Sequence, residues 1–279
     1  MRRLRDHRTT LAAAGTPEVV YVDLDGTLLG PGGSLFAGPE EAVTSRAADA
    51  LAGMHRAGVA VVPMSGRTEE QVREVARVIG ARGFIAELGG VVSREGAVEH
   101  RHGDAPGGSS PADAMLRSGG PGLLVERLPG RLVPHTPWSD LHRDATLLFR
   151  GNVDLGEVAA LLDRCGYGWM VLHDNGIIRR DFDDVDADEV HAYHLAPRGV
   201  SKAAAVAHDV RARGIDPLRA AVVGDSPSDA DAGAEVGTCF LVANGAWVAE
   251  GSTDDDPYVT DAAYGDGFAE AVDALGAGP

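Results

Sequence analysis

Short apolar runs alternate with longer amphipathic stretches along much of this chain. Four runs are rich in β-branched or small apolar residues and end in glycine or polar residues: 18–22, 59–62, 220–223 and 239–242. Continuous apolar runs of this length are typical of buried parallel strands. The stretch 40–57 repeats its apolar residues with helical spacing, on one face formed by Val43, Ala47, Leu51 and Met54. The alternation predicts an α/β fold built on a parallel sheet.

This alternation breaks down over residues 88–195. Apolar runs and helical spacing there predict a strand, a helix and a further strand, at 145–149, 153–165 and 169–172. Asp174-Asn175-Gly176 then predicts a hairpin turn into a last strand at 177–179. Because a helix followed by a hairpin is an α+β unit, we expect residues 88–195 to form an inserted domain with a small antiparallel sheet.

The insertion divides the rest of the chain into two parts, 18–87 and 196–279, which we expect to form one core domain. Residues 1–17 have no clear pattern and are predicted to be a disordered lead-in. Within the insertion, glycine, proline and serine dominate 101–122, which we expect to be a flexible loop because it offers little apolar surface to bury.

Composition and charge narrow the class of protein. The chain has 279 residues, 44% of them hydrophobic, which is enough for a substantial core. Its two cysteines, Cys165 and Cys239, argue against a disulfide framework and favour a reducing compartment. Neither a convincing signal peptide nor a membrane-length apolar run is present, so we expect a cytoplasmic protein. The formal net charge of −17 argues against a nucleic-acid partner.

The first apolar run ends in two carboxylates, Asp23 and Asp25, followed by Gly26. Residues two apart on a strand share a face, so both side chains should point to the sheet edge where open α/β sheets bind ligands. Neighbouring carboxylates repel unless a cation lies beside them or one holds a proton. The pair indicates a bound Mg²⁺, one carboxylate able to attack and one able to carry protons. The alternative is a strand followed by an acidic turn.

Further polar groups follow the other apolar runs. Ser65-Gly66-Arg67 precedes a predicted helix, and a small hydroxyl, an unhindered N–H and a helix N-terminus suit phosphate oxygens. Lys202 opens another predicted helix, Asp225 and Asp229 follow the third run, and Asn244 follows the fourth. Each also has an ordinary structural interpretation, as a helix cap, a solvated lysine, a helix start or a plain turn.

Taken in order, these segments resemble the four motifs of the haloacid dehalogenase (HAD) superfamily of aspartate-nucleophile phosphohydrolases. Asp23-Leu24-Asp25-Gly26-Thr27 is similar to motif I in its phosphatase form. Ser65 resembles the hydroxyl residue of motif II, Lys202 the lysine of motif III, and Asp225 with Asp229 the acidic residues of motif IV. The resemblance covers nearly everything from residue 18 to residue 245.

The resemblance implies a Rossmann-like, doubly wound parallel sheet with an inserted C2-type cap at 88–195. The helix–hairpin order of the insertion resembles class IIB, which includes phosphatases of sucrose, trehalose and mannosylglycerate phosphates as well as phosphomannomutases. Two positions depart from the pattern of that class. Ser228 stands where an Asn commonly precedes the last acidic residue, and Leu88 replaces the usual Asn in the turn into the cap.

The same resemblance implies the roles of the site residues. Asp23 would be the nucleophile that forms an aspartyl-phosphate, Asp25 the acid and then the base, and Ser65 and Lys202 would bind the phosphoryl oxygens. The cofactor would be Mg²⁺, with oxygen ligands from Asp23, Asp25, Asp225 and Asp229. Asp25 would contribute its backbone carbonyl, and Asp229 would act through a water or as a supporting residue. Candidate substrate contacts are Thr27, Gly66, Arg67, Arg179 and Asn244.

The implied partner is a small phosphorylated metabolite, with its leaving group held by the cap. Arg180 is an alternative to Arg179, and Trp138, Trp169 and His194 are candidates for lining the pocket, although Trp169 fits a cap core better. A phosphomutase would share every motif but release little free phosphate. A noncatalytic binding protein would be expected to lack the nucleophile or a metal ligand. A signalling receiver domain lacks such a cap, and a dehalogenase needs neither Asp25 nor Mg²⁺.

Overall fold

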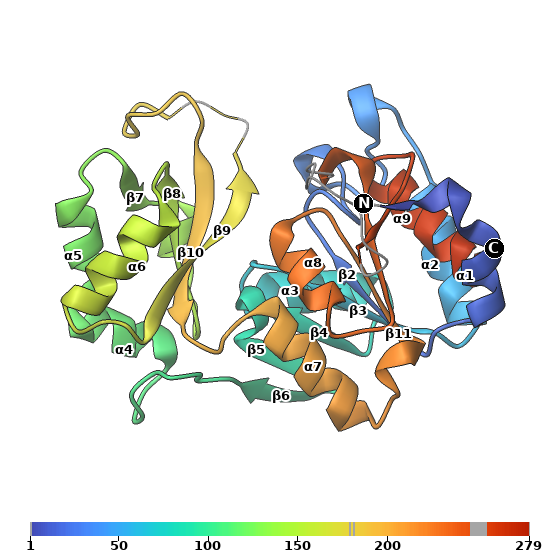
Figure 1. Ribbon diagram of the computed structural model, residues 1–279, viewed down its shortest axis with the longest axis horizontal. Coiled ribbons are helices and arrows are strands. Elements are labelled where there is room, and N and C mark those ends of the chain that lie inside the picture. The colour runs from blue at the N-terminus through green and yellow to red at the C-terminus, as the bar shows by residue number, and fades with distance from the viewer. Residues whose placement is uncertain (1, 179, 181, 246–255, 279) are drawn as a thin grey trace.

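The computed structural model describes residues 2–178, 180, 182–245 and 256–278, which form two lobes (Figure 1). The larger lobe carries both ends of the chain and is built on a nine-stranded sheet. The smaller lobe is formed by the middle of the chain and contains a separate sheet of four strands. This arrangement confirms the predicted α/β core with an inserted α+β cap.

The core sheet is mostly parallel. In chain order its strands are β1 (Arg2–Arg3), β2 (Val19–Asp23), β3 (Ala60–Met64), β4 (Gly83–Ala86), β5 (Val91–Arg94), β6 (Ala97–His100), β11 (Ala220–Gly224), β12 (Thr238–Leu241) and β13 (Tyr258–Val259). Their order across the sheet is β1-β13-β12-β11-β2-β3-β4-β5-β6. All neighbouring strands from β1 at one edge of the sheet across to β4 pair in parallel. Strands β5 and β6 extend the other edge in antiparallel pairs. The strand β2 therefore lies between β11 and β3, and all three end at the same edge.

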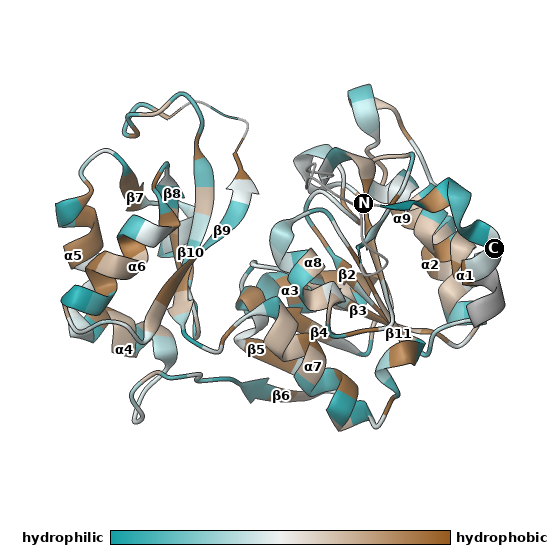
Figure 2. Ribbon diagram, in the orientation of Figure 1, coloured by the Kyte–Doolittle hydropathy of each residue, from teal (hydrophilic) through white to brown (hydrophobic). Residues whose placement is uncertain are grey.

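Helices cover both faces of this sheet, which is why its strands read as continuous apolar runs. Val20 and Val22 of β2 pack into one apolar cluster, with α1 (Arg8–Ala14), α2 (Arg46–Arg56), α3 (Glu69–Val78) and α9 (Tyr264–Ala274). Val19 and Tyr21 pack into the opposite cluster, with α7 (Lys202–Arg213) and α8 (Pro227–Gly233). Figure 2 shows the apolar strands of the core between these helices.

The cap has its own apolar core. Its sheet is antiparallel and consists of β7 (Leu132–Pro134), β8 (Leu147–Gly151), β10 (His191–Pro197) and β9 (Met170–Ile177), in that order. The helices α4 (Pro111–Ser118), α5 (Gly120–Arg127) and α6 (Leu155–Arg164) pack against it through residues such as Leu124, Val158 and Leu162. The prediction of a small antiparallel sheet in the cap is confirmed.

Several local predictions for the cap are wrong. Asp174-Asn175-Gly176 does not reverse the chain, because β9 continues through it and pairs with β10 on both sides of an irregular register. The Asp174 carboxylate accepts the Gly176 N–H at 2.8 Å, so the turn-forming residues make a bulge within a strand. The loop expected at 101–122 contains α4 and the start of α5, because Ser110 caps α4 and apolar residues such as Met115 are buried.

The predicted boundaries also differ from the structure. Strands β5 and β6, which lie within the expected cap at 88–195, belong to the core sheet. The expected disordered lead-in at 1–17 contains β1, which pairs with β13, and α1, whose Leu11 is buried in the core. The helix expected at 40–57 begins only at Arg46, and Val43 before it is 90% exposed. Among the described residues, no helix is both long and apolar enough to cross a membrane.

Candidate active site

The ends of β2 and β11 bring the acidic residues of motifs I and IV together. Val22 pairs with Val223, so Asp23 and Asp225 follow neighbouring parallel strands out of the same edge of the sheet. A carboxylate oxygen of Asp23, one of Asp225 and one of Asp229 all lie within 4.8 Å of one another. Asp23 therefore forms one cluster with Asp225 and Asp229, which lie about two hundred residues later in the sequence.

Lys202, at the start of α7, is buried between two of these carboxylates. Its Nζ donates to Asp23 Oδ1 at 2.6 Å and to Asp229 Oδ1 at 2.8 Å. Burial alone would lower the pKa of Lys202, but the charges of Asp229 and Asp23 outweigh burial and raise it. The ammonium group therefore stays charged and fixes the position of the Asp23 side chain.

Asp229 is already saturated with hydrogen bonds. Its Oδ2 accepts the backbone N–H of Asp225 at 3.2 Å, the backbone N–H of Ser226 at 3.1 Å and the Ser226 hydroxyl at 2.6 Å. Together with the Lys202 contact, these bonds make Asp229 a residue that positions Lys202 and the turn after β11. This geometry fits the supporting role among the alternatives predicted for Asp229.

The acidic cluster fits a divalent cation. Burial raises the pKa of Asp23 well above its ordinary value, with Lys202 opposing the rise and Asp229 and Asp225 adding to it. Burial and the nearby Asp229 charge likewise raise the pKa of Asp225 to about 7. Three carboxylates face one ammonium, so the pocket is short of positive charge. Carboxylate oxygens are also the donors that Mg²⁺ prefers.

The turn of motif I leaves room for Asp225. Gly26 has φ +91°, and a Cβ at this position would lie 2.1 Å from Asp225 Oδ2. The adjacent Thr27 is buried and donates its hydroxyl to Asp225 Oδ1 at 3.3 Å. Asn244 donates to the Gly26 carbonyl at 2.8 Å and accepts the Tyr264 N–H at 2.8 Å. Thr27 and Asn244 therefore brace the turn beside the acidic cluster, and their predicted contacts with substrate stay predictions.

The motif II turn lies beside this cluster. The Ser65 hydroxyl is buried and accepts the Arg67 N–H at 3.1 Å, and Thr68 caps α3 in a capping box with Gln71. The Arg67 guanidinium donates to both carboxylate oxygens of Asp25, at 2.7 Å from Nε. Arg67 thus contacts the predicted acid–base residue, and its predicted contact with substrate stays a prediction.

Cap residues close over the same turn. Arg143, from the loop before β8, donates to the Gly66 carbonyl at 2.9 Å. His194 of β10 lies so near that a Cβ on Gly66 would be 2.6 Å from its Nε2. A cavity of about 80 Å³ lies between the lobes, lined by residues that include His173 from the cap and Lys202 from the core. The structure therefore places His194 and Arg143 where the cap meets the core, and the prediction that His194 lines the substrate pocket stays a prediction.

Glu87 anchors the loop that carries Arg143, and sequence reasoning missed it. Its buried carboxylate accepts the backbone N–H groups of residues 144, 145 and 146, at 3.1, 2.9 and 3.1 Å. Glu87 and Leu88 both have positive φ, at 50° and 54°, which turns the chain sharply after β4. A charged residue directly after an apolar strand was the available signal.

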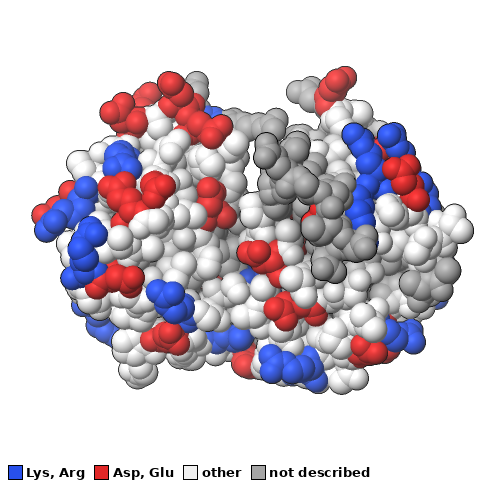
Figure 3. Space-filling view, in the orientation of Figure 1, with Lys and Arg blue, Asp and Glu red and all other residues white. Residues whose placement is uncertain are grey.

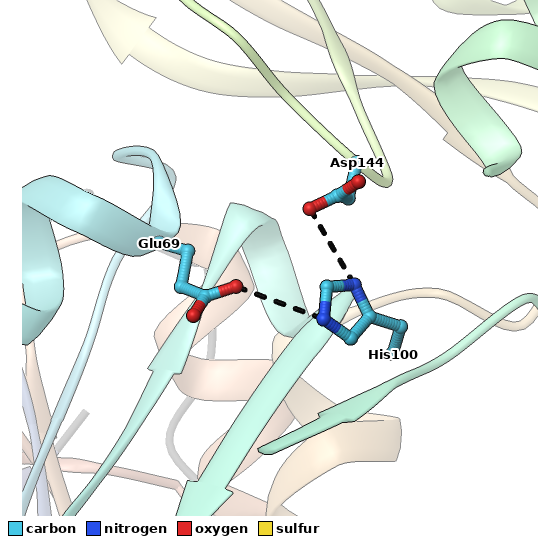
Figure 4. A group of neighbouring side chains, drawn as sticks. All are labelled: Glu69, His100 and Asp144. Atoms are coloured by element: carbon cyan, nitrogen blue, oxygen red, sulfur yellow. Dashed lines mark ion pairs between the residues drawn. The ribbon is translucent and has the colours of Figure 1, made fainter.

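A second group of titratable side chains joins the lobes nearby. His100 lies between Glu69, at the start of α3, and Asp144, in the cap loop (Figure 4). The nitrogen–oxygen distances are 3.7 Å to Glu69 and 3.5 Å to Asp144. These contacts add to those of Glu87 in holding the cap loop against the core.

The remaining predicted cap residues lie elsewhere. Arg179 falls outside the described residues, and Arg180 is exposed, with its guanidinium over the Phe182 ring. Trp169 packs against the cap core, as its alternative interpretation held, and Trp138 is 48% exposed.

Comparison with known proteins matches this architecture. No family model matches the chain. The chain is 26% identical over 256 residues to a phosphoglycolate phosphatase from Methanoculleus marisnigri, covering 91% of this chain and 95% of that protein. The solved sucrose-phosphatase from Synechocystis, in complex with sucrose and phosphate, superposes with a TM-score of 0.63 and 14% identity, over 94% of this chain and 98% of that one.

A further solved structure, of a sugar phosphatase of HAD subclass IIB, has a TM-score of 0.60 and 13% identity, over 93% of this chain and 99% of its own. The chain has the HAD fold. The three proteins compared are phosphatases by name, one of them of HAD subclass IIB, and the predicted resemblance to this superfamily is confirmed in the fold. Within the HAD fold, the cap seen here corresponds to the insertion that the residue pattern predicted.

Proposed function

We propose that this protein is a Mg²⁺-dependent phosphomonoester hydrolase that acts through an aspartyl-phosphate on a small phosphorylated metabolite. The observation that carries the proposal is the buried contact of Lys202 with Asp23 at 2.6 Å, beside the Asp225 carboxylate. A carboxylate held by an ammonium group at the end of a parallel strand is positioned to attack an anionic phosphoryl group.

Asp23 is the proposed nucleophile. A carboxylate oxygen of Asp23 attacks phosphorus, the bond from phosphorus to the ester oxygen breaks, and the phosphoryl group is transferred to Asp23. Lys202 and the Ser65 hydroxyl offset charge on the phosphoryl oxygens during this step. Splitting hydrolysis into two displacements lowers the barrier of each.

Asp25 is the proposed proton carrier. It protonates the departing alcohol, then removes a proton from the water that attacks the aspartyl-phosphate, which releases phosphate and restores Asp23. Both oxygens of Asp25 accept hydrogen bonds from Arg67, so the carboxylate must exchange Arg67 for the leaving-group oxygen before it can act. We therefore assign Arg67 a positioning role toward Asp25.

The residues that would hold Mg²⁺ are Asp23, Asp225 and the backbone carbonyl of Asp25, with Asp229 as their support. When bound, the ion supplies positive charge next to the phosphoryl oxygens. The deficit of positive charge in the acidic cluster supports this assignment.

The relatives support a small substrate. Those compared are named for phosphatases of phosphoglycolate and of sugar phosphates, which share a phosphomonoester and differ in the leaving group. In this chain the cap residues Arg143, His173 and His194 face the motif II and motif III residues, so the cap is the proposed source of selectivity.

The test is a phosphate-release assay with Mg²⁺ on a panel that includes 2-phosphoglycolate and sucrose phosphate, for the native chain and for Asp23→Asn. We expect release by the native chain on at least one ester and none above background by the variant. Interconversion of sugar phosphates with little free phosphate would instead identify a mutase. Equal inactivity of both chains on every ester would favour a binding protein.

A further inference from the structure

Several buried side-chain nitrogens have no hydrogen-bond partner among the described residues, and three of them lie on cap residues beside the core and also lack an ion pair. These atoms are Arg143 Nε, His173 Nε2 and His194 Nδ1. Arg143 and His194 are 8% and 2% exposed, so water does not readily satisfy them. Because buried polar nitrogens are normally paired, an unpaired guanidinium N–H together with unpaired imidazole nitrogens, on the side of the cap that meets the core, indicates a missing hydrogen-bonding partner.

Arg143 in particular forms no ion pair with any carboxylate of the described residues. Its NH1 group donates to the Gly66 carbonyl at 2.9 Å and to the Thr146 hydroxyl at 3.2 Å, both of which are uncharged. The nearby charge of Glu87 only partly offsets the burial that lowers the pKa of Arg143, and the Glu87 carboxylate is engaged by cap backbone N–H groups. Arg150, an equally buried arginine of the same cap, shows the contrast, because it pairs with Asp184 at 2.5 Å.

The positions of Arg143 and His194 indicate which part of the substrate the missing partner belongs to. Arg143 and His194 both contact Gly66, which directly follows the proposed phosphate-binding residue Ser65. Consecutive Cα atoms are about 3.8 Å apart, so a group bound there would be only a few ångströms from the phosphoryl group. Lys202 and Ser65 already serve the phosphoryl oxygens from the core, whereas Arg143 and His194 reach the site from the cap.

We propose that Arg143 and His194 form a carboxylate subsite, which makes the preferred substrate a short phosphorylated carboxylic acid of two or three carbons. The inference rests on the proposed phosphatase function and names its substrate class. A planar guanidinium matches a carboxylate geometrically and in charge, and the imidazole adds a donor beside it in the tautomer that carries its proton on Nδ1. The subsite is complete only when the cap lies against the core, because Gly66 belongs to one lobe and both side chains to the other.

The first test uses the native chain and two matched esters, 2-phosphoglycolate and 2-hydroxyethyl phosphate. They have the same number of carbons and differ in carrying a carboxylate or a hydroxymethyl group. We expect kcat/KM to be about 100-fold higher for 2-phosphoglycolate, because the neutral ester cannot form the desolvated charge pair with Arg143. Equal rates, or a preference for the neutral ester, would overturn the subsite and leave the phosphatase proposal standing. Activity on neither ester, matched by Asp23→Asn, would remove the phosphatase proposal itself.

The second test compares Arg143→Gln with Arg131→Gln, which changes an exposed cap arginine paired with Glu157. Arg143→Gln should lower kcat/KM about 100-fold for 2-phosphoglycolate and less than about tenfold for 2-hydroxyethyl phosphate, mainly through KM. Arg131→Gln should match the native chain on both. An equal fall on both esters for Arg143→Gln, in a protein that melts like the native chain, would contradict the assignment. If Arg143→Gln does not fold, Arg143→Lys replaces it in the test. Lysine keeps the positive charge but lacks the paired N–H donors of the guanidinium, so the variant should retain only part of the preference for 2-phosphoglycolate. Full retention of that preference would count against the subsite.

Discussion

Lys202 links the stability of the core to its chemistry. Its ammonium group is buried against Asp23 and Asp229, and no other lysine or arginine among the described residues forms an ion pair with either carboxylate. Buried carboxylates without a partner are costly, so the contact that orients Asp23, the proposed nucleophile, also stabilises the fold around it.

We expect Lys202→Met to lower the free energy of unfolding by about 3–5 kcal/mol and to abolish phosphate release, because it leaves two buried carboxylates unpaired. Chemical denaturation measures the first effect and the phosphate assay the second. Adding Asp229→Asn to this variant should recover part of the stability but none of the activity. A Lys202→Met protein as stable as the native chain would mean that the pair contributes little.

His191 gives a pH-dependent contribution in the cap, away from the acidic cluster. Its ring nitrogens lie 2.8 Å from Asp174 and 3.1 Å from Glu189. Burial alone would lower the pKa of His191, but these carboxylates outweigh burial and raise it. A raised folded pKa stabilises the protein below the unfolded value of about 6.5, and this stability is lost as pH rises through the folded pKa.

The expected result is that His191→Gln costs more stability at pH 6 than at pH 8.5. The difference should be a few tenths of a kcal/mol, because the pair is partly exposed to solvent. Denaturation curves of both chains at the two pH values, at constant ionic strength, measure it. A cost that is independent of pH would show that the imidazole contributes by packing alone.

The junction between β4 and the cap depends on Glu87, whose carboxylate collects the backbone N–H groups of three consecutive cap residues. We expect Glu87→Gln to lower the free energy of unfolding by about 1–3 kcal/mol, since an amide offers one acceptor oxygen where the carboxylate offers two. The same change should lower kcat/KM, because Arg143 is carried on the anchored loop.

Glu99→Gln is the matched control, since Glu99 is an exposed residue of β6 that pairs with His208. It should leave both stability and activity close to native values. Denaturation and the phosphate assay on the two variants compare them directly. Equal effects of the two substitutions would show that the Glu87 contacts are not what holds the loop.

Strands that are buried on both faces of the sheet could be predicted from the sequence. Strands that form only because they pair with a distant segment could not. The strands β2, β3, β11 and β12 lie within two residues of their predicted positions because their apolar runs need no partner to be recognised. The sequence of residues 174–176 predicts a turn, yet these residues belong to strand β9 because β9 pairs with β10. Similarly, β1 is two residues long and exists only because β13 offers an open edge.

The candidate site shows the same division. Asp23, Asp225 and Lys202 each begin or end a regular element in the core, so their meeting at one edge follows from parallel topology alone. Arg143 carries no local signal, and the position of Glu87 after an apolar strand does not reveal its partners, because the roles of both residues arise from the docking of the cap on the core. The hydrogen bonds of Asn244 with the backbone of Gly26 and Tyr264 were likewise not predictable, because they depend on the folded positions of distant segments.

Acidic residues outnumber basic residues in the whole molecule, 42 against 25. The formal net charge is −17, and Figure 3 shows Asp and Glu side chains spread over both lobes on the visible face. Surface carboxylates are screened within about 8 to 10 Å at ordinary salt, so they do not set the properties of the buried cluster. General salt effects and specific metal binding can therefore be separated by experiment.

We expect Mg²⁺ to raise the melting temperature of the native chain and not that of Asp225→Asn. An ion that binds the folded state alone stabilises it by about 2.7 kcal/mol at a concentration one hundred times its Kd, and removing it with a chelator reverses the gain. Potassium chloride at matched ionic strength is the control for screening, and it should affect both chains equally. If Mg²⁺ shifts both chains by the same amount as the control salt, the acidic cluster is not a metal site. A shift confined to the native chain would instead tie the ion to the carboxylate that packs against Gly26, because the two chains share every other acidic group.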